Sequence, residues 1–269
     1  MRLTQRKNTI EENLQAWDRV HPWQEEGDEW SASWGSAQFQ WTVSILPRIQ
    51  RFLPAKTILE IAPGHGRWTQ FLLSQCERLI AVDLSPTCIE SCKRRFANNS
   101  RLELHKNDGM SLAMIPDESV DFAFSFDSLV HAEAGVLLQY VKQLGRKLRP
   151  GGAGFLHHSN AAGYRSLLGI GALLRKMPVL RMANPYIERH WRAMDTTARL
   201  MLGFCEQSGL RCVSQELVPW GKTLLPIDCL TTFERPLEAE TKPPRVVTNL
   251  YFMREAKAAR RLSDLYRLE

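Results

Sequence analysis

The sequence predicts an α/β protein built on a doubly wound, mostly parallel sheet. Between residues 57 and 157, five short apolar runs alternate with segments of helical periodicity. Parallel neighbours in a sheet need long crossover connections, which are usually helices, so this alternation favours parallel strands with helices on both faces. Hydrophobic residues make up 44% and charged residues 24% of the 269 residues, a balance that excludes a disordered or collagen-like chain.

The expected elements follow one another in a regular order. Strands are predicted at residues 57–61, 79–82, 102–105, 120–126 and 153–157, with helices at 68–76, 85–96 and 134–148. The turn Arg149-Pro150-Gly151-Gly152 ends the last of these helices. After a helix at 196–208, two further runs at 211–218 and 229–233 would complete a seven-stranded sheet, and an amphipathic helix at 253–265 closes the chain.

Composition and charge narrow the classes of function. No apolar run reaches the roughly 18 residues of a membrane span, and the start lacks the apolar segment of a signal peptide, so we expect a cytoplasmic protein with no membrane partner. The net charge of +6 suggests nucleic acid, but the basic residues are spread over several predicted helices. The six cysteines include no CxxC pair and are expected to be buried thiols rather than metal ligands.

A glycine-rich turn follows the first predicted strand. It reads Glu60-Ile-Ala-Pro-Gly-His-Gly66 and opens a helix, and the carboxyl ends of strands bind ligands in open α/β sheets. Thr69 stands where a dinucleotide fingerprint needs its third glycine, and the Glu60 carboxylate would repel a pyrophosphate. Asp83, which ends the next strand, suits both ribose hydroxyls, and Asn107-Asp108-Gly109 suits an adenine. The pattern indicates a positively charged ligand with a ribose and an adenine but no phosphate.

With these motifs in order, the chain resembles the class I S-adenosylmethionine-dependent methyltransferases. The resemblance covers roughly residues 55–160 and includes the strand at 120–127 and the turn at 148–152. Ala62-Pro63 departs from the glycine-bearing pair that is commoner in the family. The resemblance implies a Rossmann-like methyltransferase fold and S-adenosylmethionine as the cofactor. The cofactor-binding residues that it implies are Glu60, Ala62, Pro63, Gly64, His65, Gly66, Asp83, Leu84, Asn107, Asp108, Gly109 and Phe126.

Candidate catalytic residues follow the fourth and fifth predicted strands. Methyl transfer needs the acceptor atom close to the sulfonium and, for a hydroxyl, a base for its proton. Asp127 and His131 are spaced to share one helical face, and His131 is either this base or a hydrogen-bond partner of the cofactor or backbone. In the pair His157-His158 the side chains point to opposite faces of the strand. We expect His158 to be a base or substrate ligand, with a structural histidine as the alternative.

A metal ion is the less favoured alternative at these strand ends. Asp127, His158 and Asn160 are residue types that a Mg²⁺ site would use, and some sugar and catechol methyltransferases have such a site after these strands. A hard cation prefers several oxygen ligands, however, and only one carboxylate is present. We therefore assign no metal ligands.

The acceptor is predicted from the segments that flank the resemblance. Five of the eight tryptophans lie in the first 41 residues, and we expect residues 1–50 to form a helical lid over a methyltransferase domain at 51–269. Residues 161–195 are expected to insert a substrate cap after the fifth strand. The tryptophans either stack on the acceptor or pack a helix onto the sheet. Substrate contacts are assigned to Trp34, Trp41, Asn160, Tyr164, His190 and Arg192.

Arginines beside aromatic side chains suit a sugar ring or an anionic group. We therefore expect O-methylation of a sugar, a glycan or a glycosylated small molecule, in glycan or natural-product biosynthesis. The alternatives are N- or O-methylation of another small molecule, RNA methylation, and a non-catalytic module that binds S-adenosylmethionine. RNA is disfavoured because Phe126-Asp127-Ser128 replaces the Asn-Pro-Pro-Tyr-like motif that would hold a flipped base.

Overall fold

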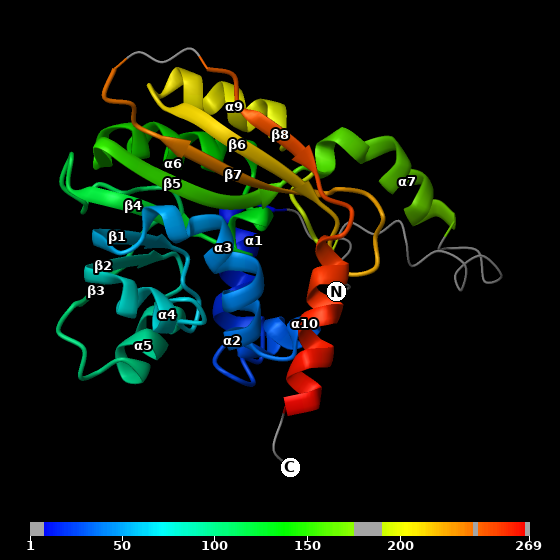
Figure 1. Cartoon of the computed structure of the whole chain (residues 1–269), viewed down its shortest axis with the longest axis horizontal. Coiled ribbons are helices and arrows are strands. Elements are labelled where there is room, and N and C mark those ends of the chain that lie inside the picture. Colours follow the sequence, from blue (N-terminus) through cyan, green and yellow to red (C-terminus); the bar gives the residue numbers. More distant parts are fainter. Residues whose placement is uncertain (1–7, 175–189, 239–241, 267–269) are drawn as a thin grey trace.

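One eight-stranded sheet runs through the part of the chain that the structure, a computed structural model, describes: residues 8–174, 190–238 and 242–266 (Figure 1). The strand order is β3-β2-β1-β4-β5-β7-β6-β8. Only β7 pairs antiparallel, with β5 and β6; the other pairs are parallel. The strands are β1 (Ala55–Ile61), β2 (Cys76–Asp83), β3 (Leu102–Lys106), β4 (Val120–Ser125), β5 (Leu148–Ser159), β6 (Arg211–Val218), β7 (Asp228–Glu234) and β8 (Arg245–Thr248).

The predicted α/β class with a mostly parallel sheet is confirmed, with one strand more than the seven expected. The additional strand, β8, is a four-residue edge strand whose side chains are all exposed, so it lacks the apolar alternation that marks a half-buried strand. The helices are α1 (Ile10–Leu14), α2 (Ala37–Gln40), α3 (Leu46–Ile49), α4 (Thr69–Leu72), α5 (Pro86–Arg95), α6 (Ala134–Lys147), α7 (Arg165–Leu174), α9 (Ala198–Gln207) and α10 (Phe252–Tyr266).

The two faces of the sheet bury two separate apolar clusters. On one face α6 supplies Leu137, Val141 and Leu144, at the three- and four-residue spacing of a helical stripe, and α9 supplies Met201 and Phe204. The other face is covered by α4, α10 and the turns of residues 34–52. Figure 1 shows this arrangement, with α6 and α9 on the opposite side of the sheet from α4 and α10. Helices on both faces explain why the central strands are almost wholly buried.

The strand order reverses between β1 and β4, which are neighbours in the sheet. Chain connections leave this point toward β2 on one side and β5 on the other, so the loops after β1 and β4 separate and open a crevice at the carboxyl ends. In register, Glu60 of β1 lies beside Ala81 of β2 and Phe124 of β4. The residues that follow these strands therefore converge at one edge of the sheet.

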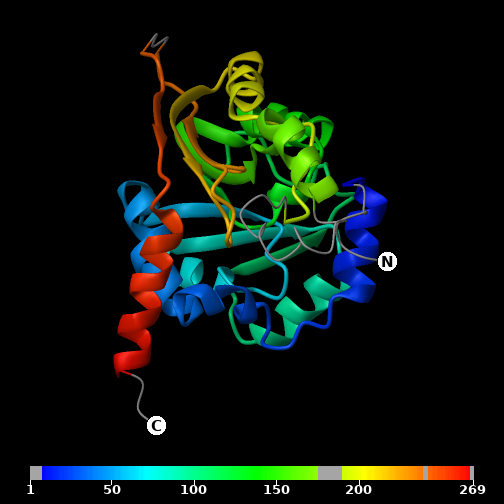
Figure 2. The ribbon, with the colours of Figure 1, turned by 90° about the vertical axis from the view of Figure 1, so that its right-hand side faces the viewer.

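The N-terminal segment divides into two parts with different surroundings. Helix α1 continues as a π-helical stretch, Gln15–Val20, and lies on the far side of the molecule from α10 in Figure 2. The later turns, from Asp28–Trp34 through α2 and the stretch Trp41–Ile45, pack beside α10. The expectation of one lid over residues 1–50 is therefore corrected: residues 8–30 reach the ligand crevice, whereas Ile45 and Ile49 are fully buried in the core.

Candidate active site

A cavity of about 560 Å³ lies at the carboxyl ends of β1, β2 and β4. That volume is typical of a small-molecule site. Its walls come from the turn after β1, the ends of β2 and β4, the N-terminal segment 8–30 and residues 190–192. Of the residues predicted to bind the cofactor, those that line it are Ala62, Pro63, Gly64, His65, Asp83, Leu84, Gly109 and Phe126.

The turn after β1 exposes backbone to this cavity. Gly64 has φ +59°, and a Cβ built there would approach the indole of Trp23 to 3.0 Å, so glycine fits both the backbone and the space. Ala62 also has positive φ, at 58°, a conformation that costs energy for a residue with a side chain. Ser128 donates its hydroxyl hydrogen to the Ala62 carbonyl at 2.9 Å. The alanine that departs from the family motif thus keeps the shape that a glycine would give.

Asp83 closes one side of the turn. Its Oδ2 accepts the backbone N–H of Gly64 at 3.1 Å, and its Oδ1 accepts that of Ser85 at 2.8 Å. Burial raises the pKa of Asp83 to about 6, although these backbone donors oppose the rise. The carboxylate is ionised at neutral pH and retains lone pairs that face the cavity it lines.

Four residues predicted to bind the cofactor do not line the cavity: Glu60, Gly66, Asn107 and Asp108. Glu60 is buried inside the sheet, where its Oε2 accepts the Thr69 hydroxyl at 2.6 Å and burial raises its pKa to about 8. The carboxyl is therefore protonated at neutral pH. The argument that its negative charge selects a cationic ligand is corrected by this, because the group is neither charged nor at the cavity wall.

The adenine motif has an indirect role in shaping the cavity. Asn107 is buried, and its amide donates to the Tyr140 hydroxyl and the Ser111 carbonyl, both at 3.0 Å, while its Oδ1 accepts the N–H of Gly109. The carboxylate of Asp108 accepts backbone N–H groups of its own loop. These bonds hold Gly109 against the cavity, so the two polar side chains build the loop rather than the wall.

Arg67 and Asp127 form an ion pair at the cavity beside the glycine turn. Arg67 Nη2 donates to Asp127 Oδ2 at 2.9 Å, and both side chains are buried. The other terminal nitrogen, Nη1 of Arg67, is buried and has no hydrogen-bond partner among the described residues. A buried guanidinium N–H without an acceptor is costly, so this atom fits a ligand carboxylate. Asp127 itself has φ 63°, and its Oδ1 lies 3.8 Å from Nη2 of Arg192.

His131 lies in the cavity wall in contact with two tryptophans, which also contact each other. Its ring centroid is 4.6 Å from that of Trp191 and 5.2 Å from that of Trp17. Nδ1 lies 2.8 Å from the Trp191 carbonyl oxygen, which can only accept, so the hydrogen is on Nδ1 and Nε2 keeps its lone pair. Burial, with the charge of Arg192, lowers the pKa of His131 to about 4. The imidazole is neutral at physiological pH.

The histidine pair of β5 is placed the other way round from the prediction. His158 is fully buried away from the cavity, with its ring nitrogens 2.9 Å from the Ser159 carbonyl and 2.7 Å from the Thr231 hydroxyl. The expectation that His158 is a base or substrate ligand is corrected by this arrangement. His157 does not line the cavity either but contacts a residue that does: its Nδ1 accepts the backbone N–H of Asp127 at 3.1 Å, and its Nε2 lies 3.2 Å from Asp228.

Arg192 and Asp228 complete this buried network. The guanidinium of Arg192 binds both carboxylate oxygens of Asp228 at 2.8 Å, a bidentate pair. Asp228 is fully buried, and the charge of Arg192 with the nearby His157 ring holds its pKa below the usual range despite the burial. Sequence analysis singled out Arg192 but assigned no role to His157 or Asp228, and Asp228 lies one residue before the predicted strand at 229–233, with no motif around it.

Aromatic side chains make up most of the remaining wall. Trp17 is the centre of this group, with ring centroids of His21, Trp23 and Trp30 within 6.0 Å of its own. These residues, together with Trp191 and Trp220, line the cavity. The excess of tryptophan near the start of the chain predicted an aromatic contribution to the site, but it did not indicate which tryptophans line the cavity.

Four of the six predicted substrate contacts lie elsewhere. Trp34 and Trp41 are packed in the core under the sheet, where the indole N–H of Trp34 donates to Ser44 at 2.7 Å. Asn160 is buried and bonded to the Pro226 carbonyl and the Ala198 N–H, and Tyr164 packs in a small separate cluster. These assignments are corrected; His190 and Arg192 do line the cavity. Of the predicted cap, residues 175–189 lie outside the described residues.

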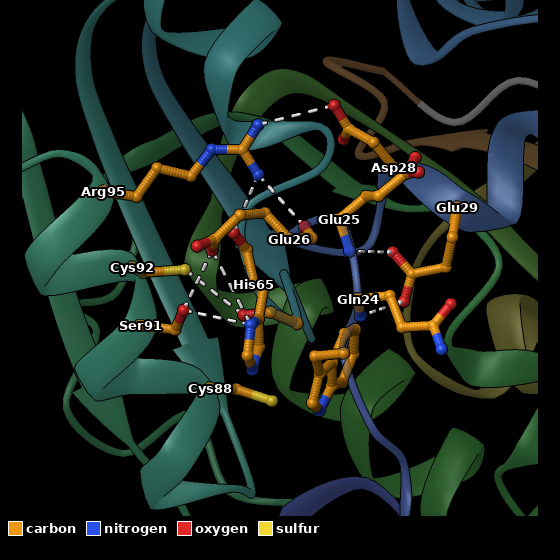
Figure 3. Close-up of polar contacts among 12 residues, drawn as sticks. Gln24, Glu25, Glu26, Asp28, Glu29, His65, Cys88, Ser91, Cys92 and Arg95 are labelled. Atoms are coloured by element: carbon orange, nitrogen blue, oxygen red, sulfur yellow. Dashed lines mark hydrogen bonds and ion pairs between the residues drawn. The ribbon is translucent and has the colours of Figure 1, made fainter.

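The N-terminal segment is held over the glycine turn by polar contacts with α5 (Figure 3). Arg95 donates to the carbonyls of Glu26 and His65 at 3.0 and 3.1 Å, and lies 3.7 Å from Asp28. Ser91 donates to the Glu26 carboxylate at 3.1 Å. Trp23 stacks on His65 with centroids 4.1 Å apart. The N-terminal segment 8–30, called the lid below, is thereby held in contact with the cofactor side of the cavity.

Within residues 8–174, 190–238 and 242–266 no group of three or more His, Cys, Asp or Glu side chains is arranged to hold a metal ion. The six cysteines are free and buried. None of the described helices is both long and apolar enough to cross a membrane.

Comparisons with known proteins agree with the geometry. Residues 58–152 match the family model described as a methyltransferase domain. Over 91 residues the chain is 33% identical to ribosomal RNA small subunit methyltransferase A from Prochlorococcus marinus, a match that covers 33% of this chain and 33% of that relative's length.

Two solved structures have the same fold. One is an S-adenosylmethionine-dependent methyltransferase from Methanosarcina mazei, with a TM-score of 0.54, 16% identity, and coverage of 71% of this chain and 98% of the other. The second is the N-methyltransferase NodS from Bradyrhizobium japonicum in complex with S-adenosyl-L-homocysteine, with a TM-score of 0.52, 17% identity, and coverage of 84% and 96%.

The described residues adopt a Rossmann-like methyltransferase fold. Residues 58–152 match a methyltransferase domain, and both solved structures that share the fold are methyltransferases, one of them named as S-adenosylmethionine-dependent. The match to the curated relative spans about a third of that relative's length. The segments that build the other walls of the cavity lie outside residues 58–152.

Proposed function

We propose that this protein transfers a methyl group from S-adenosylmethionine to a hydroxyl of a neutral, ring-containing small molecule, with a sugar or glycosylated compound as the first candidate. The observation that carries the proposal is His131, a neutral imidazole in the wall of the cavity with its Nε2 lone pair free of a proton. The unprotonated Nε2 can accept the proton of a hydroxyl at physiological pH, with a lower basicity than an ordinary histidine because its pKa is lowered to about 4.

The residues at the strand ends fit the cofactor. Asp83 offers carboxylate oxygens to ribose hydroxyls, and Leu84, Gly109 and Ile10 give an apolar surface for the adenine. The unpartnered Nη1 of Arg67 suits the carboxylate of the methionine part. When bound, S-adenosylmethionine supplies an electrophilic methyl group on a sulfonium centre.

The acceptor side contributes orientation and a proton acceptor. His131 Nε2 would take the hydroxyl hydrogen as the oxygen bonds to the methyl carbon, and the Nδ1–H bond to Trp191 fixes the ring for this transfer. Trp17 and Trp191 contact His131 and each other, and tryptophan faces pack against the C–H groups of a sugar or against a flat ring. The walls also keep water from the sulfonium.

Charge balance in the cavity supports a neutral acceptor. Arg67 is paired with Asp127 and Arg192 with Asp228, so each buried guanidinium already has a carboxylate. The remaining carboxylate, Asp83, offsets the sulfonium charge of the cofactor. Neither buried guanidinium in the cavity therefore carries an uncompensated charge that would attract an anionic acceptor.

A transfer screen with methyl-labelled S-adenosylmethionine tests the proposal. The panel contains neutral glycosides, phenols, amines and small-subunit ribosomal RNA, each incubated with the wild-type protein, Asp83→Asn and the control Asp108→Asn. We expect label in a hydroxyl of a glycoside or phenol, greatly reduced with Asp83→Asn and retained with Asp108→Asn. Label in ribosomal RNA or in amines alone would overturn the acceptor class, and wild-type protein that transfers no label to any member would overturn the activity.

A further inference from the structure

Two asparagines at the start of the described chain contact the His131 region from outside the matched domain. Asn8 Nδ2 donates to the Trp191 carbonyl oxygen at 3.3 Å, the same oxygen that accepts the Nδ1 hydrogen of His131. Asn13 Nδ2 donates to the backbone carbonyl of His131 at 3.0 Å. One asparagine thus binds the His131 backbone directly, and the other binds the carbonyl oxygen that accepts the hydrogen of the His131 ring.

The two asparagines belong to one small, cross-linked turn. Asn13 Nδ2 also approaches the carbonyls of Asn8 and Thr9, each at 3.0 Å, and the Thr9 hydroxyl accepts the Glu12 N–H at the start of α1. Asn8 is buried, with 6% of its surface exposed. Because the turn is braced by its own hydrogen bonds, its two amides reach His131 and Trp191 as a unit rather than as independent side chains.

The Trp191 carbonyl needs such support. His190 and Trp191 have φ of 46° and 53°, two consecutive left-handed residues that carry side chains. This conformation is unfavourable and persists only where neighbouring contacts hold it. The contacts include the N–H of Ala193, which donates to the Val130 carbonyl at 3.0 Å, and the amide of Asn8. Loss of the asparagine contacts would leave the carbonyl freer to turn away from His131.

The same turn also reaches the cofactor end of the cavity. A Cβ built on Gly109 would lie 3.0 Å from Cγ2 of Ile10, so α1 packs directly on the adenine loop. One turn of chain therefore touches the expected adenine site, the His131 backbone and the carbonyl that orients the His131 ring.

We propose that Asn8 and Asn13 are positioning residues for His131: they hold the Trp191 carbonyl and the His131 backbone so that the ring keeps its Nδ1–H tautomer with Nε2 toward the acceptor. The inference rests on the proposed role of His131 as the base. It means that the N-terminal segment 8–30 orients the proposed base, in addition to covering the cavity. Neither asparagine touches the reacting atoms.

The test is the tautomer of His131, observed by two-bond ¹H–¹⁵N correlation spectra. Full-length protein labelled with ¹⁵N-histidine is saturated with S-adenosylhomocysteine at pH 7, and the His131 signals are assigned with His131→Phe. Wild type should give the pattern of a single neutral ring protonated on Nδ1. Asn13→Leu, which keeps the volume and removes the donor, should give averaged shifts of two tautomers, and Asn8→Leu a smaller change in the same direction. Gln15→Leu, an exposed amide on the same segment, should leave the spectrum unchanged.

The outcomes separate this inference from the proposed function. An unchanged His131 pattern in Asn8→Leu and Asn13→Leu, both folded and bound to S-adenosylhomocysteine, overturns the positioning role. If a leucine variant fails to fold, Asn8→Ser and Asn13→Ser take its place and are judged by the same spectra. With an acceptor from the screen, kcat of Asn13→Leu should fall about tenfold, with KM for S-adenosylmethionine within about threefold of wild type. If His131→Phe transfers methyl groups normally, the base assignment fails while the spectra still report on positioning.

Discussion

The two halves of the cavity are built in different ways. The cofactor half consists of strand ends and their turns, with Gly64, Asp83 and Gly109 all inside residues 58–152, which match the methyltransferase domain. The acceptor half consists of His131, which lies inside that match, and of side chains from residues 8–30, 190–192 and Trp220, which lie outside it. One half is the carboxyl edge of a sheet; the other is assembled from segments that meet only in the folded chain.

The difference explains where specificity resides. In the cofactor half, backbone groups and one carboxylate make the contacts, and the register of β1 and β2 fixes their positions. In the acceptor half, the contacts join residues far apart in sequence, such as Asn8 with Trp191. A sheet edge can be kept while the surrounding segments change, so relatives with the same cofactor can differ in acceptor. Both halves can be tested separately.

The largest expected effect is in the acceptor half. His131→Phe keeps an aromatic ring in contact with Trp17 and Trp191 but removes the proton acceptor, so kcat for the acceptor found in the screen should fall about 10²–10⁴-fold. Affinity for S-adenosylhomocysteine, measured by calorimetry, should change less than about threefold. Since the pKa of His131 is lowered to about 4, wild-type kcat should show no loss from its protonation above pH 5.5. His105→Phe, a half-exposed histidine on β3, is the matched control.

A smaller loss is expected in the cofactor half. Asp83→Asn replaces a charged acceptor of ribose hydroxyls with a neutral one and should weaken S-adenosylhomocysteine binding by about 100-fold. The pKa of Asp83 is raised to about 6 by burial, and its protonated form must lose the proton to accept two hydroxyls. Wild-type affinity should therefore be constant above pH 7 and decline as pH falls through 6. Calorimetry from pH 5 to 8 measures both the loss of affinity in Asp83→Asn and the decline of wild-type affinity at low pH. A pH-independent affinity in wild type would argue against the Asp83 carboxylate as the acceptor of the ribose hydroxyls.

What the sequence could predict follows the same division. The positions of Gly64 and Asp83 follow from strand periodicity and spacing, because the ends of parallel strands meet at one edge. Glu60 has the same local signal, but its side chain turns into the core toward Thr69, and periodicity alone does not show which polar residue is sequestered. His157 and His158 are adjacent on β5, so the strand pattern requires their side chains to lie on opposite faces of the sheet. Which of the two lies on the side of Asp127 depends on the contact of His157 with Asp228, which is 71 positions away in the sequence.

The tryptophans show most clearly which parts of the site cannot be predicted from the sequence. Trp17 and Trp41 occur in similar helical stretches, yet one lines the cavity and the other stacks on Phe71 in the core. What separates them is tertiary: α10 covers the turns around Trp41, while Trp17 meets residues 131 and 191. Composition indicated a role for the segment, and only the packing assigned the individual residues.

A third prediction contrasts these two tryptophans. Trp17→Leu should raise KM for the acceptor about tenfold through lost ring contacts, with little change in unfolding free energy. Trp41→Leu should lower the unfolding free energy by about 3 kcal/mol, because it leaves a cavity in the core, with KM near wild type. Denaturant titration gives the unfolding free energy of each variant, and steady-state kinetics gives its KM for the acceptor. Equal effects of the two substitutions on KM would mean that the division of the N-terminal segment is wrong.

The smallest effect concerns Glu60, which adjoins the cofactor half without lining it. Its pKa is about 8 in the folded protein, against about 4.5 for an ordinary glutamate, so between these values the folded state holds a proton that the unfolded state has lost. Stability from this group is therefore present at low pH and declines as pH rises toward 8, by up to about 1.4 kcal/mol per pH unit. Glu60→Gln keeps an acceptor for Thr69 and cannot ionise. Denaturant titrations at pH 6.5 and 8 should show a smaller decline for the variant than for wild type, with S-adenosylhomocysteine affinity within about threefold. If the free energy of unfolding declined equally for wild type and Glu60→Gln, Glu60 would be ionised in the folded protein. Its negative charge would then have to be counted with that of Asp83 in the cofactor half.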